Sequence, residues 1–160
     1  MSTRKTTRAL KTLKPVRWDR VKINDGFWGQ RVTTNRKVTL PIEYEQCKKT
    51  GRIDAFKLDW KAGMPHCPDR FWDSDVAKWV EAAAYSLATH PDKQLQKKLD
   101  NVIDLIASAQ QEDGYLNTHF TTVRPQDRWK NLRDDHELYC AGHLMEAAVA
   151  VYEGLGDRKL

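Results

Sequence analysis

Apolar residues recur at helical spacing through residues 95–109, and this pattern constrains the fold more than any other feature. They fall at i, i+4, i+7, i+8, i+11 and i+14: Leu95, Leu99, Val102, Ile103, Ile106 and Ala109. Charged residues lie outside this stripe, so the segment is predicted to be an amphipathic helix with one face in a core. Residues 135–153 are instead apolar on most sides, which predicts an interior helix with neighbours on both sides.

Two further helices follow from weaker patterns. Ser74 is a candidate N-cap for a helix with apolar positions between residues 76 and 87, and the turn at residues 90–92 ends it. A looser helical face begins near Val32 and ends at Gly51. The fold class expected is therefore all-α, with helical hairpins joined by long loops.

The segments around these helices are shorter or irregular. Val21 and Ile23 alternate with polar residues, which predicts a short strand or an extended arm. Pro41 is expected to start or kink the first helix. Residues 51–72 read as a long irregular connection, and a stretch of this kind in a small domain is often a functional loop.

The positive charge of the chain is concentrated at its N-terminal end. The formal net charge is +5, yet six basic residues precede the first acidic residue, Asp19. Residues 18–160 are consequently close to neutral. This distribution predicts a basic disordered tail over residues 1–17, with a transit peptide as the alternative. It argues against a nucleic-acid partner, which calls for a basic surface on the folded body.

Hydropathy and cysteine content narrow the class of protein further. No apolar run approaches the length of about 18 residues that spans a membrane, so no membrane partner is expected. The three cysteines are too few for a disulfide framework and indicate a reducing compartment. No apolar core of a secretory signal occurs in the sequence, so a cytoplasmic location is expected.

A polar stripe interrupts the apolar helix expected at residues 135–153. Its members are His136, Tyr139, His143 and Glu146, which lie within about 80° of one another around a helix. Burying polar side chains without partners costs free energy. The stripe is therefore expected to face a polar cavity, a ligand or a hydrogen-bonded network of side chains.

The same helix offers a zinc-binding alternative. His136, Cys140 and His143 have side chains that suit zinc and follow one another at one-turn spacing. The segment that opens with His136 falls short of the zinc-protease pattern because Cys140 replaces the second histidine. The competing interpretation makes Cys140 a thiol in the core.

Acidic and aromatic residues gather at other predicted helix starts and turns. In Phe71-Trp72-Asp73-Ser74-Asp75, the acids either cap the helix or, beside aromatic rings, hold a sugar. Asp134-Asp135 is expected to cap the helix that follows it. Asp113-Gly114 predicts a turn that lets Tyr115 reach a cavity.

These segments, in this order, resemble the N-terminal part of the catalytic domain of glycoside hydrolase family 127, the β-L-arabinofuranosidase family. The resemblance covers roughly residues 18–160. Its matching stretches are NDGFWGQR at 24–31, GRIDAF at 51–56, FWDSDVAKWVEAAAYSLATHPD at 71–92, AQQEDGYL at 109–116 and HELYCAGHLMEAAVAVYEG at 136–154.

The resemblance implies a partial (α/α)6 toroid around a sugar pocket. It also implies a retaining hydrolase that removes terminal β-L-arabinofuranose with a zinc-held cysteine nucleophile. In that family the nucleophile, the zinc ligands and the acid/base glutamate lie downstream of the matched region. No catalytic residue and no metal ligand is therefore expected here, and Cys140 does not match the nucleophile. We expect a truncated toroid without catalysis.

The same resemblance implies which residues contact the sugar. His136 matches a histidine that contacts the sugar in the family, and Asp75 and Trp79 belong to a shared segment near the cavity. Tyr115 and His143 are the remaining candidates for substrate binding. The family often has tyrosine at the position of Ala77, so any contact made by that ring is absent here.

The expected partner is a carbohydrate, an L-arabinofuranosyl residue or a related sugar. Two alternatives remain open: a noncatalytic helical module that binds a sugar or a protein partner, and the zinc-binding protein described above. The apolar face of the last helix makes association into an oligomer possible.

Overall fold

The computed structural model describes residues 13–24 and 26–160, and all regular structure in these residues is helical. The α-helices are α1 (Gly26–Thr34), α2 (Leu40–Lys49), α3 (Trp72–Thr89), α4 (Lys93–Ala109), α5 (His119–Thr122) and α6 (Glu137–Leu155). Shorter turns are the 3-10 helices η1 (Trp18–Arg20), η3 (Asp54–Lys57) and η4 (Pro125–Asp127) and the π-helical turn η2 (Asn35–Thr39). The all-α prediction is confirmed.

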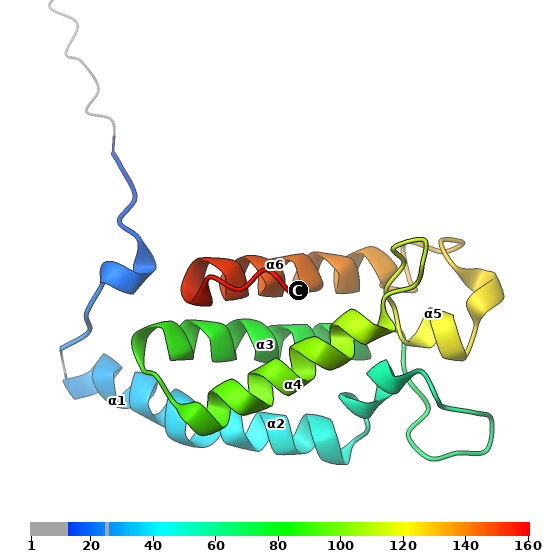
Figure 1. The fold of residues 1–160 in the computed structure, drawn as a ribbon, viewed down its shortest axis with the longest axis horizontal. Coiled ribbons are helices and arrows are strands. Elements are labelled where there is room, and N and C mark those ends of the chain that lie inside the picture. Colours follow the sequence, from blue (N-terminus) through cyan, green and yellow to red (C-terminus); the bar gives the residue numbers. More distant parts are fainter. Residues whose placement is uncertain (1–12, 25) are drawn as a thin grey trace, which may run out of the picture.

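Helix α3 lies at the centre of the described helices and packs parallel to α6 (Figure 1). Both begin at the end that carries α5 and the long loops, and α4 crosses beside them (Figure 1). Small residues line their contact and let the two backbones approach closely. A Cβ atom added to Gly154 would lie 3.2 Å from the Cβ of Ala88 on α3.

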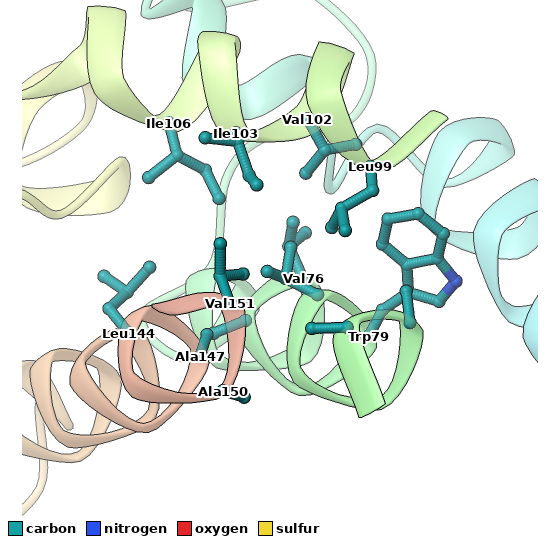
Figure 2. Close-up of a cluster of buried hydrophobic side chains, with 14 of the residues drawn as sticks. Val76, Trp79, Leu99, Val102, Ile103, Ile106, Leu144, Ala147, Ala150 and Val151 are labelled. Atoms are coloured by element: carbon teal, nitrogen blue, oxygen red, sulfur yellow. The ribbon is translucent and has the colours of Figure 1, made fainter. Parts of the chain in front are cut away.

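The apolar stripe of α4 closes the core over this pair. Leu99, Val102, Ile103 and Ile106 are at most 2% exposed, as the spacing predicted. Figure 2 shows these side chains facing Val76 of α3 and Val151 of α6. The helix begins directly after the turn expected at residues 90–92. Asp92 caps it by accepting hydrogen bonds from the backbone N–H groups of Gln94 and Leu95.

The two N-caps predicted from the sequence are wrong. Helix α3 begins at Trp72, and Ser74 lies inside it with its hydroxyl donating to the carbonyl of Phe71 at 2.7 Å. Helix α6 begins at Glu137 after His136, which occupies the cap position without a side-chain hydrogen bond. Asp135 is drawn instead into ion pairs with two arginines, a tertiary interaction that local sequence spacing does not reveal.

Helix α6 also differs from the interior helix that its composition predicts. One face packs on α3, and Leu144, Ala147, Ala150 and Val151 are buried there. The opposite face is exposed in the described part of the chain: Leu138, Met145, Val149 and Tyr152 are each at least half exposed. The apolar surface expected from the sequence is therefore present on one side of α6 only.

The N-terminal segments agree only in part with the structure expected from the sequence. The first helix starts at Gly26, earlier than its apolar face suggested, and the π-helical turn connects it to α2. Pro41 lies in the first turn of α2, directly after the π-helical turn. Val21 and Ile23 are exposed and form no strand. Most of the predicted basic tail, residues 1–12, lies outside the described residues.

None of the described helices is long and apolar enough to cross a membrane.

Candidate functional site

A polar pocket of about 540 Å³ opens between the N-terminal ends of α3 and α6. Its lining comes from two segments that lie far apart in the sequence, and includes Phe71, Asp75, Lys78, Arg133, His136 and Tyr139. Both segments were singled out from sequence, the first for acids beside aromatics and the second for its polar stripe. The parallel packing of α3 and α6 brings them together.

His136 occupies the entrance to α6 in an unusual backbone conformation. Its φ of 60° lies in the left-handed region, which histidine adopts far less readily than glycine. Its carbonyl accepts the N–H of Cys140 at 2.9 Å, so the first turn of α6 is built directly on it. The imidazole is half-buried beside the rings of Phe71 and Tyr139, with centroid distances of 6.1 and 5.8 Å.

The polar stripe of α6 forms a continuous row of contacts. The rings of Tyr139 and His143 meet edge to face at 4.6 Å, and Nδ1 of His143 lies 2.8 Å from a carboxylate oxygen of Glu146. Lys78 of α3 donates a hydrogen bond to the Tyr139 hydroxyl at 2.6 Å. His136 and Tyr139 line the pocket, whereas His143 lies further along α6, outside its lining.

Asp75 lies on the pocket wall, and its carboxylate forms an ion pair with a neighbouring arginine. Nε of Arg52 is 2.8 Å from its carboxylate, and the guanidinium of Arg52 stacks on the ring of Trp72 at 4.9 Å. A second cavity of about 450 Å³ adjoins the first, and Asp75 and Lys78 line both. Asp75 thus presents a fixed acceptor toward two adjacent hollows.

Trp79 lies in the core instead of standing free in the pocket. Its side chain is 2% exposed, its Nε1 donates to the carbonyl of Leu40 at 3.0 Å, and its ring packs on Tyr44. It also belongs to the lining of the second cavity and does not line the pocket that contains His136. The structure thus gives Trp79 a packing role, and a sugar contact by this residue stays a prediction.

Tyr115 is directed away from the pocket that contains His136. Its hydroxyl donates a hydrogen bond to the carboxylate of Glu137, and its ring packs against Trp129 at 5.2 Å. Burial, followed by the bond to Glu137, raises the pKa of this hydroxyl well above its ordinary value. Tyr115 lines a separate, mainly apolar cavity of about 390 Å³ between α4 and α6.

Three buried acids lie at the same end of the helices, and the sequence suggested a functional role for only one of them, Asp73. Asp73, Asp135 and Glu137 are each at most 3% exposed. Asp73 accepts the N–H and the hydroxyl of Thr118 at 2.8 and 2.6 Å, and burial raises its pKa to about 6. For Asp135 and Glu137 the only signal in the sequence was their place at a helix start, where acids are ordinarily exposed caps.

The zinc-binding alternative is not supported by the geometry. Cys140 is fully buried, its thiol donates to the carbonyl of Arg70, and burial raises its pKa to about 12. A zinc ligand must be a thiolate, which this site disfavours. Among the described residues, no group of three or more His, Cys, Asp and Glu side chains could hold a metal ion. The residues present therefore do not fit the zinc that the resemblance implies.

The described residues form an all-α domain in which the parallel helices α3 and α6 share a pocket with charged and aromatic lining at their N-terminal ends. The comparison with known families is specific. The model of the β-L-arabinofuranosidase GH127 catalytic domain matches residues 20–160, so the chain belongs to glycoside hydrolase family 127. Its helices are part of the (α/α)6 toroid expected from the sequence.

Individual relatives agree with this assignment. A non-reducing end β-L-arabinofuranosidase of Bifidobacterium longum subsp. longum is 45% identical over 93 residues, which is 56% of this chain. A GH127 β-L-arabinofuranosidase from Geobacillus stearothermophilus T6 superposes with a TM-score of 0.80 at 42% identity over 86% of the chain. A second GH127 β-arabinofuranosidase gives 0.83 at 39% identity over 91%.

The chain matches only a small share of each relative. It spans 14% of the Bifidobacterium protein and 23% and 24% of the two solved structures.

Proposed function

We propose that the pocket at the N-terminal ends of α3 and α6 binds a terminal β-L-arabinofuranosyl residue, or a closely related sugar, for a hydrolase of this family. The observation that carries the proposal is the convergence of two distant segments on one pocket around His136. Family membership and the names of the relatives support the choice of sugar.

The lining suits a small sugar. Phe71 and Tyr139 are partly exposed, and their rings offer flat apolar surface to the C–H face of a furanose. His136 and Lys78 supply groups that can hydrogen-bond to sugar hydroxyls, and Asp75 supplies an acceptor. Charged and aromatic groups in one concave site are the usual composition of a specific small-molecule site.

Recognition and chemistry are separable in this proposal. Retaining hydrolysis needs a nucleophile and an acid/base group on the reacting bond. No residue of this chain matches the cysteine nucleophile, zinc ligands or acid/base glutamate that the family resemblance implies. We therefore propose that residues 18–160 contribute sugar binding and do not hydrolyse the glycoside by themselves.

Binding is tested by titrating the chain with methyl β-L-arabinofuranoside, using calorimetry and NMR. The informative variant is His136→Asn, because asparagine tolerates the left-handed backbone while removing the imidazole. We expect affinity to fall about ten-fold, the equivalent of one good hydrogen bond. The matched control, His90→Asn, lies at the opposite end of α3 and should leave affinity unchanged.

Two results would overturn the binding proposal. One is the absence of saturable binding by the unmodified chain at millimolar sugar, and the other is equal affinity in His136→Asn. The catalytic part is tested separately with 4-nitrophenyl β-L-arabinofuranoside. We expect no release of 4-nitrophenol, and zinc-dependent turnover by the purified chain would contradict the separation of binding from chemistry.

A further inference from the structure

Two bulky residues of the loop that leads into α6 have left-handed backbones. Trp129 has a φ of 62° and His136 a φ of 60°, and neither is a glycine or an asparagine. Such conformations persist only where the surrounding structure determines them, and they cluster at binding sites. The contacts that hold this loop should therefore show what the conformation serves.

The carboxylate of Glu137 connects these two positions. It follows His136 directly, is 2% exposed, and accepts the backbone N–H of Trp129 at 2.8 Å through Oε2. Its other oxygen accepts the hydroxyl of Tyr115. One buried group thus joins the start of α6 to the left-handed residue at the other end of the loop and to the preceding loop.

A second buried carboxylate lies on the other side of His136. Asp135 is 3% exposed and is held by two arginines, with N–O distances of 3.3 Å to Arg70 and 3.7 Å to Arg124. Arg70 also donates to the carbonyl of Asp134 at 3.1 Å. The side chains on both sides of His136 are therefore buried and bonded, while His136 lines the pocket.

We propose that Glu137, assisted by Asp135, is a positioning residue that holds His136 in its left-handed conformation and so directs the imidazole into the pocket. Glu137 itself does not line the pocket, so its effect on the ligand passes through His136. The placement of the imidazole stands on the contacts above. Its consequence for sugar affinity rests on the proposed function.

The placement is tested without any sugar, by NMR of the imidazole ring in Glu137→Ala. We expect the contacts between the ring protons of His136 and those of Phe71 to disappear. The His136 chemical shifts should move to those of an exposed histidine. In Glu137→Gln the remaining amide oxygen can still accept the Trp129 N–H, so partial rescue is expected. Asp73→Asn is the matched control, because this buried acid bonds to Thr118 and not to the loop.

The consequence is tested by a double-mutant cycle on methyl β-L-arabinofuranoside affinity. Glu137→Ala should lower affinity about ten-fold when His136 is present and less than two-fold in the His136→Asn background. A purely structural role would give the same loss in both backgrounds, and that result overturns the proposal.

The remaining outcomes also decide the question. If Glu137→Ala does not fold, Tyr115→Phe removes a single hydrogen bond to the same carboxylate, and a smaller displacement of the imidazole signals is expected. Unchanged His136 signals in the folded variants would overturn the proposal. If the unmodified chain binds no sugar, the proposed function fails, while the ring contacts still confirm or reject the positioning role.

Discussion

The two ends of the α3–α6 pair are built from opposite kinds of residue. At the C-terminal end, the buried Ala84 and Ala150 and the small Gly154 let the helices approach closely. At the N-terminal end, Asp73 and Glu137 are buried where apolar residues would pack at lower cost. We therefore expect substitutions at the apolar end to change mainly stability, and substitutions at the polar end to change mainly the pocket.

The largest expected effect comes from a cavity at the apolar end. Leu87→Ala removes a 3% exposed side chain from the core and should lower the free energy of unfolding by about 2–5 kcal/mol. Denaturant unfolding measures this loss, and sugar affinity should be unchanged. Val149→Ala on the exposed face of α6 is the control, with an expected change within about 0.5 kcal/mol. A large loss of affinity in folded Leu87→Ala would mean that the two ends are not independent.

The next effect concerns the buried acid at the polar end and depends on pH. Burial raises the pKa of Asp73 from 3.8 to about 6, so folding favours its protonated form. The stability that this group contributes is fully present below pH 3.8 and is lost as pH rises through 6, amounting to about 3 kcal/mol. Unfolding curves of the unmodified chain and of Asp73→Asn should therefore diverge between these pH values, with the variant relatively more stable at pH 7. Curves that stay parallel would contradict this.

A smaller loss is expected from overpacking the close approach at the apolar end. In Gly154→Val the new Cβ lies 3.2 Å from the Cβ of Ala88, and its methyl groups have no space between the helices. The free energy of unfolding should fall by about 1–3 kcal/mol. Thermal and urea unfolding measure it. If the variant kept full stability, the small residues would not be what sets the distance between α3 and α6.

A small gain is expected from the other glycine inside the same helix. A Cβ at Gly142 meets no atom within 4 Å, so Gly142→Ala adds helix propensity without a clash. The free energy of unfolding should rise by about 0.4–1 kcal/mol. Comparing Gly142→Ala with Gly154→Val in the same assay shows whether available space or helix propensity determines the stability change at a glycine of α6. A loss of stability in Gly142→Ala would indicate that the surface of α6 around Gly142 is covered in solution.

No effect at all is expected from metal removal. Dialysis against EDTA should leave the melting temperature and the zinc content of this chain unchanged, because Cys140 is buried as a thiol beside the carbonyl of Arg70. Stoichiometric zinc that survives dialysis, measured by elemental analysis, would revive the zinc-binding alternative.

Much of the fold followed from periodicity. The stripe on α4 predicted its buried face, with Leu95 only partly buried, and the turn at residues 90–92 placed the break before this helix, because both signals are local in sequence. The predicted helix starts at Ser74 and Asp135 were wrong for different reasons, because Ser74 lies inside α3 and bonds locally to the carbonyl of Phe71, whereas Asp135 has tertiary partners. A capping residue and a residue with a tertiary partner look alike in sequence, and Asp135 is engaged by Arg70 and Arg124 from distant segments.

The candidate site was predicted in part. The sequence placed His136 and Tyr139 on one stripe, and the structure puts both on the pocket wall with Asp75. It also grouped Trp79 and Tyr115 with them, but the structure gives these residues partners in the core and on Glu137. An aromatic residue close in sequence to pocket residues can either line the pocket or pack behind its wall, and the sequence pattern is the same in both cases.

Features that depend on spacing within a helix could be predicted from the sequence alone: the all-α class, the core face of α4 and the polar stripe on α6. Each depends on residues a few positions apart, whose relative direction is fixed by helix geometry. Three features became evident only in the tertiary structure: which acids are buried, which aromatic residues face the pocket, and the hydrogen bond from the Trp129 N–H to Glu137. Those outcomes depend on loops and on the parallel packing of α3 against α6, where the free energy of burial is set by partners distant in the chain.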